Sequence, residues 1–356
     1  MKNKKLDRGK FEFDELISVL NNMVPDLMEV IERRYNVLRI INFLGPIGRR
    51  SLSDKLDLTE RNIRTASTAL KRQGLININQ EGMIITPRGK NTLDRLKYIF
   101  HIIKGLKVLE EKLKDVLKIK NVIIVPNSSE DDPFIYKEMG KTAANYLRGV
   151  IKDDSIIGLT GGTTIAQVVE EYRVEKDKFT NVTVVPARGG LGKKVEYQAN
   201  TIVQNLANKL QCNYKTLYTP DFLSKDTIES LLKEPSIKEI TELIEDIDIL
   251  IFGIGRADKM ADRRGLKEEE IETLLKKGAV SEAFGYYFNE SGEIVHEIST
   301  IGIELQTFKR IKNLIAVAGG SDKAKSIISI SELNKNLTLV CDESVAKKII
   351  FKYKEE

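Results

Sequence analysis

The sequence predicts an α/β protein in two parts, an N-terminal winged helix-turn-helix and a C-terminal domain with a mostly parallel β-sheet. Residues 1–120 read as helices with one short β element, whereas apolar runs alternate with helical segments after Asn121. That alternation is typical of a parallel sheet with helices on both faces. The net charge changes sign at the same place. Residues 1–120 carry 25 Lys+Arg and 15 Asp+Glu, hence +10, and the other 236 residues carry 32 and 37, hence −5.

The predicted DNA-binding domain, residues 1–90, shows three helices and a hairpin. A first helix should end near Leu44, and Ser51 or Ser53 would cap a short second helix, LSDKL. The third helix, ERNIRTASTALKRQ, follows the N-cap residue Thr59 and stops at Gly74. The segments LININ and MIITP, separated by QEG, then read as a β-hairpin. Three helices followed by a hairpin predict a winged helix-turn-helix whose third helix is the recognition helix.

The third helix has one apolar and one polar face. Ile63, Ala66 and Leu70 have the spacing of a core-facing stripe. The residues expected at base edges open the helix: Thr59, Glu60, Arg61, Asn62 and Arg64. The residues expected at DNA phosphates are Arg49, Arg50, Lys71, Arg72 and Arg88. We expect double-stranded DNA as the partner. A protein-interaction module is one alternative, against which the +10 charge argues, and a solvated basic face is another, which charge alone leaves open.

Residues 91–120 predict a linker helix. Ile99, Ile102, Leu106, Leu109, Leu113 and Val116 are spaced 3, 4, 3, 4 and 3 residues apart. This spacing is typical of a coiled-coil seam or of a helix lying on a core. We expect the helix to help the chain dimerise, and packing against its own chain is the alternative.

The C-terminal part, residues 121–356, contains six apolar runs of strand length. They are VIIV (122–125), SIIGL (155–159), VTVV (182–185), DILIFGIG (248–255), NLIAVAGG (313–320) and LTLVC (337–341). Several of them contain or end in glycine. Because open α/β sheets bind ligands outside the carboxyl ends of their strands, we expect a ligand site at these glycines.

The segment GLTGGTTIAQVVEE, residues 158–171, reads as a strand, a tight turn and the start of a helix. Gly161 and Gly162 would let an anion approach backbone N–H groups, and the Thr163 and Thr164 hydroxyls would add donors. The segment is neither a Walker A loop nor a dinucleotide fingerprint, so ATP and NAD are not expected. A tight turn with no ligand is the alternative interpretation.

Cationic residues follow other strands. Arg188 lies in PARGG, Arg263 and Arg264 lie in DRRG, and Lys323 lies in GGSDK. Singly, each would be a solvated surface charge. Together with the glycine-rich turns they predict a site with room for more than one phosphate.

These segments resemble a known family. PDLMEVIERRYNVLRIINFLGPIGRRSLSDKLDLTERNIR, GLTGGTT, PARGGLG, FGIGRADKMADRRG and VAGGSDKAKSI occur in the order typical of the SorC family of bacterial transcription factors. Within it the chain is similar to the regulators of glycolytic genes. The resemblance covers nearly the whole chain.

The resemblance implies a repressor. Its C-terminal domain would share the fold of ribose-5-phosphate isomerase and glucosamine-6-phosphate deaminase, and fructose 1,6-bisphosphate would relieve repression. By motif, Gly161, Gly162, Thr163 and Thr164 would hold one phosphate. Arg188, Lys323 and either Arg263 or Arg264 would supply cations, and Gln198 and Glu282 would meet sugar hydroxyls. The alternatives are another sugar phosphate or, on the same fold, an isomerase or deaminase.

Other classes are not expected. The chain has two histidines, and nothing matches the Asp-Gly-Ala-Asp-Glu segment of the isomerases, so we expect no enzyme. Two scattered cysteines predict neither a disulfide framework nor a metal site, and no cofactor is indicated. With no long apolar run and no apolar stretch after the N-terminal lysines, we expect a cytoplasmic protein away from the membrane. For a repressor that holds two or more winged helices against an operator, we expect a homodimer or homotetramer.

Overall fold

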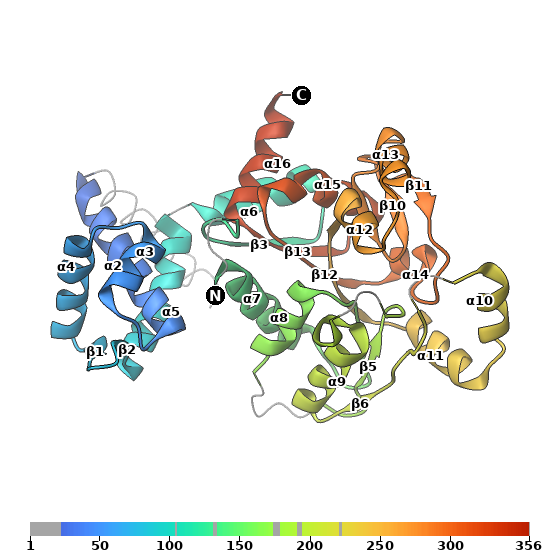
Figure 1. The fold of residues 1–356 in the computed structure, drawn as a ribbon, viewed down its shortest axis with the longest axis horizontal. Helices are drawn as coiled ribbons and strands as arrows, with labels where there is room; N and C mark the ends of the chain where they lie inside the picture. Colours follow the sequence, from blue (N-terminus) through green and yellow to red (C-terminus); the bar gives the residue numbers. More distant parts are fainter. Residues whose placement is uncertain are drawn as a thin grey trace, which may run out of the picture. The chain divides into compact units, whose positions relative to one another are not determined.

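The computed structural model describes residues 23–103, 105–130, 134–173, 179–190, 194–220 and 223–355. The chain forms two units, residues 1–107 and 108–356. Figure 1 shows the elements in chain order. The end of the PARGGLG segment after Gly190 lies outside the described residues.

The N-terminal unit is a winged helix-turn-helix, as the sequence predicts. Its first elements are α2 (Pro25–Leu44), α3 (Arg49–Leu56) and α4 (Glu60–Arg72). The antiparallel strands β1 (Ile76–Ile78) and β2 (Met83–Ile85) form the wing. Ile47 pairs with Met83 and joins the α2–α3 connection to the wing.

The start of α3 differs from expectation. The helix begins at Arg49 after the N-cap residue Gly48, and no side chain caps it. The Ser53 hydroxyl instead donates to the carbonyl of Leu58, beyond the end of the helix. Thus Ser51 and Ser53 lie inside the helix, and Arg49 and Arg50 form its first turn.

The linker is two helices rather than one. These are α5 (Pro87–Ile103) and α6 (Leu106–Leu117), with Gly105 at φ 60° between them. A positive φ interrupts helical geometry, and glycine adopts it without a steric penalty. Leu106 and Leu113 are fully buried within this one chain, as expected if the segment packs against its own chain. The side chain of Ile102, another residue of the predicted seam, lies outside the described residues. A role in dimerisation stays a prediction.

Seven parallel strands form the large sheet of the C-terminal unit, in the order β3-β13-β12-β7-β4-β5-β6. Their bounds are β3 Asn121–Val125, β4 Ile156–Leu159, β5 Thr183–Pro186, β6 Asn213–Tyr214, β7 Ile249–Gly253, β12 Asn313–Ala318 and β13 Leu337–Asp342. All six predicted strands are confirmed. The edge strand β6 was missed because two residues show no periodicity.

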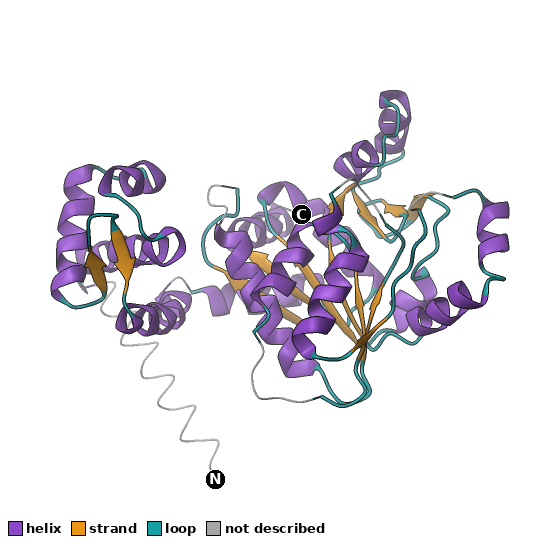
Figure 2. Cartoon of the chain, turned by 60° about the horizontal axis from the view of Figure 1, so that its bottom comes forward, coloured by secondary structure: helices purple, strands orange, loops and turns teal. Residues whose placement is uncertain are grey.

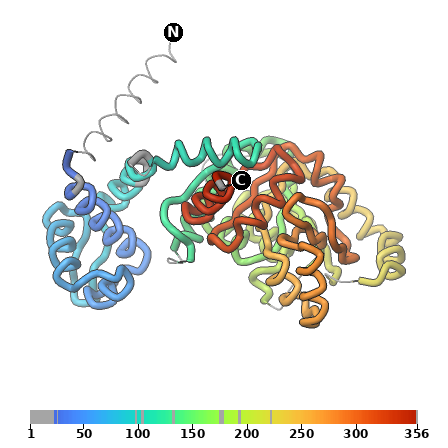
Figure 3. Tube along the Cα trace, turned by 90° about the horizontal axis from the view of Figure 1, so that it is seen from above, coloured from blue at the N-terminus to red at the C-terminus, as the bar shows by residue number. Residues whose placement is uncertain are grey.

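Helices cover both faces of this sheet. Figure 2 shows the fan of strands behind the helices of one face. Three helices share one apolar core with it: α7 (Phe134–Val150), α8 (Thr163–Glu171) and α9 (Ala199–Leu210). The chain crosses the sheet in one direction from β3 to β6 and then returns through β7 and β12 to β13, so right-handed crossovers place the later helices on the opposite face. There lie α11 (Pro235–Glu245), α15 (Ala324–Leu333) and α16 (Glu343–Glu355), the last two side by side in Figure 3.

A smaller antiparallel sheet is inserted between β7 and β12, in the order β11-β10-β9-β8. Its strands are β8 (Gly255–Arg256), β9 (Ser281–Ala283), β10 (Tyr286–Phe288) and β11 (Ile294–Glu297). Helices α12 (Ala257–Arg263), α13 (Glu268–Lys276) and α14 (Leu305–Arg310) accompany it, and α10 (Lys225–Leu231) follows β6. Because β8 starts just after β7, this sheet lies at the carboxyl end of a central strand. None of the described helices is long and apolar enough to cross a membrane.

Candidate functional site

The predicted recognition helix α4 has one buried apolar face and one exposed polar face. Thr59 caps it, since its hydroxyl accepts a hydrogen bond from the N–H of Asn62 at 3.3 Å. Ile63, Ala66 and Leu70 are buried, as predicted. This leaves Glu60, Arg61 and Arg64 exposed, with Asn62 partly buried beside its cap. The structure also assigns Thr59 a local task that is independent of any base contact.

The cations expected at DNA phosphates are all exposed: Arg49, Arg50, Lys71, Arg72 and Arg88. They come from the start of α3, the end of α4 and the start of α5. Cations at a helix C-terminus, such as Lys71 and Arg72, also stabilise that end. Their DNA contacts remain predictions.

The parallel register brings the second set of residues together. Leu159 of β4 lies opposite Ile251 and Pro186, and Gly253 of β7 lies opposite Val317 of β12. The segments that follow β4, β5, β7 and β12 therefore meet at one edge of the sheet. The strand order reverses between β4 and β7, which is where open α/β sheets bind ligands.

The start of α8 is built to approach an anion. Gly162 is the N-cap residue, with φ 119° and no side chain to cap the first turn. The first N–H groups of a helix have no acceptor within it and attract negative charge. A Cβ on Gly161 would lie 2.8 Å from the carbonyl oxygen of Tyr197, so this position accepts only glycine without a shift. Thr163 is exposed and Thr164 half-buried at the same end.

Arg188, Glu282 and Arg264 form a buried cluster. Oε1 of Glu282 accepts from Arg188 at 3.2 Å, from Arg264 at 2.8 Å and from the N–H of Gly285 at 2.8 Å. Burial alone would raise the pKa of Glu282, but the charges of Arg264 and Arg188 outweigh it and lower that pKa. Glu282 therefore stays ionised and orients both guanidinium groups. Oε2 takes part in none of these three bonds.

The neighbours Arg263 and Arg264 occupy different environments. The Arg264 side chain is 4% exposed, donates to the Tyr287 hydroxyl at 3.0 Å and lies 5.7 Å from its ring centroid. Arg263 is exposed. Sequence reasoning could not choose between them, because adjacent residues on a helix differ only in the direction that they face.

Lys323 lies in the turn Ser321–Lys323, labelled η2, just before α15. The pKa of Lys323 is lowered. Burial is the largest cause, the charge of Arg263 acts in the same direction, and the charge of Asp322 opposes them. The charge of Arg263 therefore acts on that of Lys323.

Arg256 was not among the predicted site residues. It follows β7 and donates to Asp258 at 3.0 and 2.6 Å and to Asp322 at 2.6 Å. These carboxylates raise the pKa of Arg256. The sequence signal was the GIGRAD segment after β7, in which Arg256 follows a glycine at the end of a predicted strand.

Gln198 is the N-cap residue of α9 and is partly buried. A Cβ on Gly190 would lie 3.9 Å from its Oε1 atom, so the amide adjoins the turn after Arg188. In the described part of the chain, no group of three or more His, Cys, Asp or Glu residues could hold a metal ion.

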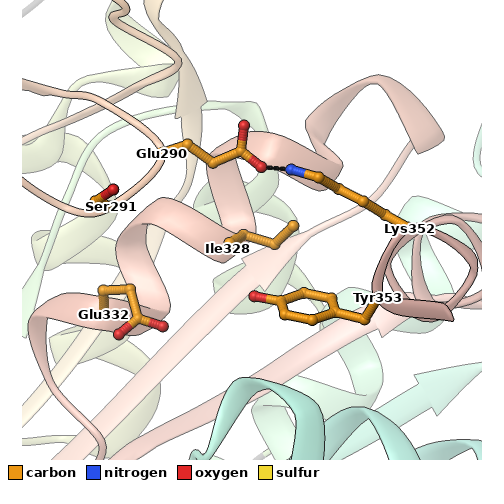
Figure 4. A pocket seen from close by; sticks show the side chains of 6 residues that line it. All are labelled: Glu290, Ser291, Ile328, Glu332, Lys352 and Tyr353. Carbon is orange, nitrogen blue, oxygen red and sulfur yellow. Dashed lines mark ion pairs between the residues drawn. The ribbon is translucent and has the colours of Figure 1, made fainter. Parts of the chain in front are cut away.

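A separate pocket lies between the β10–β11 turn and the C-terminal halves of α15 and α16. It has a volume of about 480 Å³ and is lined by Glu290, Ser291, Ile328, Glu332, Lys352 and Tyr353. Figure 4 shows Lys352 paired with Glu290 across its upper side. None of these residues follows a strand of the large sheet, so the pocket is not part of the site described above.

Comparison with known proteins supports the two-part interpretation. Residues 30–100 match the family described as "CggR N-terminal DNA binding domain", and residues 101–351 match "Putative sugar-binding domain". The Central glycolytic genes regulator of Priestia megaterium is 40% identical over 336 residues, 94% of this chain and 98% of the relative. The regulator of that name from Bacillus subtilis is 40% identical over 337 residues, 95% and 99% of the two chains.

Solved structures agree. A SorC family transcriptional regulator from Enterococcus faecalis has a TM-score of 0.63 at 36% identity, covering 68% of this chain and 99% of that one. The full-length sorbitol operon regulator of Klebsiella pneumoniae has a TM-score of 0.63 at 18% identity, covering 88% and 97%, which shows the fold alone.

Fold and comparisons together define a transcriptional regulator with a DNA-binding and a sugar-binding domain. The chain belongs to the family of central glycolytic genes regulators, CggR, within the SorC regulators. These relatives are regulators and not enzymes, so the isomerase or deaminase alternative is set aside.

Proposed function

We propose that the protein represses glycolytic genes by binding operator DNA and that fructose 1,6-bisphosphate relieves the repression. The observation that carries the proposal is the presence of two anion-attracting groups at one sheet edge. One is the uncapped start of α8, and the other is the cation pair of Arg263 and Lys323. Two separate groups suit a ligand with two phosphates.

Within this proposal each residue has a task. Thr163 and Thr164 hold one phosphate through N–H and hydroxyl donors, and Gly161 and Gly162 let it approach closely. The N–H of Gly162 itself donates to the carbonyl of Tyr197 at 2.8 Å. Arg263 and Lys323 hold the other, and Arg188 adds charge between them. Gln198 and Oε2 of Glu282 meet sugar hydroxyls. We assign Arg264 to the support of Glu282, because its side chain is buried against that carboxylate and Tyr287.

The proposed mechanism is allosteric and needs no metal or cofactor. The protein acts in the cytoplasm as a homodimer or homotetramer that presents at least two winged helices to the operator. Effector binding lowers operator affinity by a coupling of ~1–3 kcal/mol, or about 5- to 150-fold. The segment of α5 and α6 joins the two domains in sequence and would transmit this change.

Fluorescence anisotropy on labelled DNA from upstream of the protein's own gene tests the proposal. Fructose 1,6-bisphosphate is titrated at fixed salt, with glucose 6-phosphate, fructose 6-phosphate and deoxyribose 5-phosphate as controls. We expect selective release by the bisphosphate. Specific DNA binding that only a control ligand changes would overturn the choice of effector, and the absence of specific DNA binding would overturn the repressor itself.

A further inference from the structure

Arg256 joins the two loops that carry the cation pair. It is the N-cap residue of α12, the helix that ends at Arg263, and its guanidinium also reaches Asp322, the residue before Lys323. Two bonds to Asp258 hold the guanidinium in a forked geometry at 3.0 and 2.6 Å. Such bidentate pairs are directional as well as strong.

The charges of two carboxylates act on Lys323, those of Asp322 and Asp342, and Asp342 is already held by backbone N–H groups such as that of Gly320. Asp322 is therefore the carboxylate that could interfere with phosphate binding. It adjoins Lys323 in sequence, and its charge acts on that residue. Over the described residues, no hydrogen bond or ion pair involves the Lys323 ammonium or the Arg263 guanidinium. Without Arg256, the Asp322 carboxylate would turn toward these cations and would compete with an incoming phosphate.

The backbone of the Lys323 loop is held independently of Arg256. Glu130 accepts from the Ser321 hydroxyl at 3.0 Å and from the N–H of Asp322 at 3.3 Å. Asp342 accepts from the N–H of Gly320 at 2.9 Å. Loss of Arg256 should therefore release the Asp322 side chain while the loop stays in place.

We propose that Arg256 is a positioning residue that holds the Asp322 carboxylate away from Lys323 and Arg263 and so keeps both cations available to a phosphate. The inference rests on the proposed function, because it concerns the same sugar-bisphosphate site. It adds a competing anion and the group that restrains it. Arg256 itself does not touch the ligand.

Calorimetric titration of the full-length protein with fructose 1,6-bisphosphate provides the test. Four proteins are compared: wild type, Arg256→Gln, Asp322→Asn and the double variant. Arg256→Gln should lose about tenfold or more in affinity, the effect of one charge-assisted hydrogen bond. Asp322→Asn should bind within about threefold of wild type, and the double variant should return to that range, because the competing charge is gone.

A purely structural role predicts another pattern. In that case the double variant would bind as weakly as Arg256→Gln or more weakly, and this result would overturn the proposal. So would wild-type affinity in Arg256→Gln. If Arg256→Gln does not fold, Asp322→Asn alone still decides, since a loss of more than about tenfold there contradicts a competing role.

Two controls separate this inference from the proposed function. Lys276→Gln removes an exposed cation whose partner is Glu272, and it should bind like wild type. If wild type itself does not bind fructose 1,6-bisphosphate, the proposed effector is wrong, and the role of Arg256 falls with it. If wild type binds and only the rescue fails, the effector stands and the role of Arg256 is wrong.

Discussion

The two units hold their cations differently. On α4, the Arg61 and Arg64 side chains are exposed on one face of a single helix. At the sheet edge, the buried Arg188 and Arg264 share the carboxylate of Glu282, and the partly exposed Arg256 is paired with Asp322, 66 residues away. Exposed cations suit a polyanion that brings many phosphates. A buried cation is stable only when an opposite charge pairs with it, so the paired carboxylate contributes as much to the site as the cation itself.

The largest expected effect is on the buried cluster. Glu282→Ala should lower the free energy of unfolding by about 3–5 kcal/mol, because it leaves two buried guanidinium groups without their shared carboxylate. Urea unfolding at neutral pH measures this change. Glu272→Ala, which breaks an exposed pair with Lys276, should cost less than about 1 kcal/mol. Similar losses in both variants would contradict the comparison.

Asp342→Asn should have the next largest effect. The carboxylate accepts from the N–H groups of Ser129, Gly320 and Val345 at 2.8, 2.9 and 3.0 Å. Burial would raise its pKa, but these bonds and the Ser129 hydroxyl outweigh burial and lower it. Loss of the charge should cost about 1.5–3 kcal/mol at pH 7.

The same group gives a pH dependence. Since the pKa of Asp342 is lower in the folded state, its stabilisation is present above the unfolded pKa of about 3.9 and is lost as the pH falls through the folded pKa. Thermal unfolding between pH 7 and pH 3 should therefore show a smaller loss of stability in Asp342→Asn than in wild type. Asp115→Asn, an exposed control, should follow wild type, and an identical slope in Asp342→Asn would refute the assignment.

Arg64→Ala tests the exposed set. We expect operator affinity to fall by about 1–3 kcal/mol, with effector affinity unchanged, because the side chain is exposed on the polar face of α4. Lys71→Ala should weaken all DNA sequences alike and reduce the salt slope by about 1. Anisotropy titrations at several salt concentrations measure both effects. Arg95→Ala, an exposed arginine on α5, is the control, and an equal loss there would show a general charge effect.

Thr163→Val should have the smallest effect. It removes one hydroxyl from the α8 cradle and leaves the N–H groups, so affinity for fructose 1,6-bisphosphate should fall by about 1 kcal/mol, or about fivefold. Calorimetry measures it against Thr273→Val, whose hydroxyl bonds to the carbonyl of Glu269 within α13. Unchanged binding in Thr163→Val would remove this hydroxyl from the site.

The sequence by itself determined the local features. The cap at Thr59, the apolar stripe of α4, the six longer strands and the glycine turn before α8 all follow from patterns within a few residues. Such patterns set hydrogen bonding and burial within one element, and the parallel alternation then brings strand ends to one edge. This was enough for the fold class, and it predicts the ligand site at that edge.

Only the tertiary structure decided how the charges are paired. Arg188 and Glu282 are 94 residues apart, and Arg256 and Asp322 are 66 apart. The tertiary structure also showed that the linker is interrupted at Gly105. It showed as well that the Arg264 side chain is buried and that Arg263 is exposed to solvent. The physical reason is that the energy of a charge depends on its burial and on the nearest opposite charge, and both are properties of folded neighbours rather than of adjacent residues.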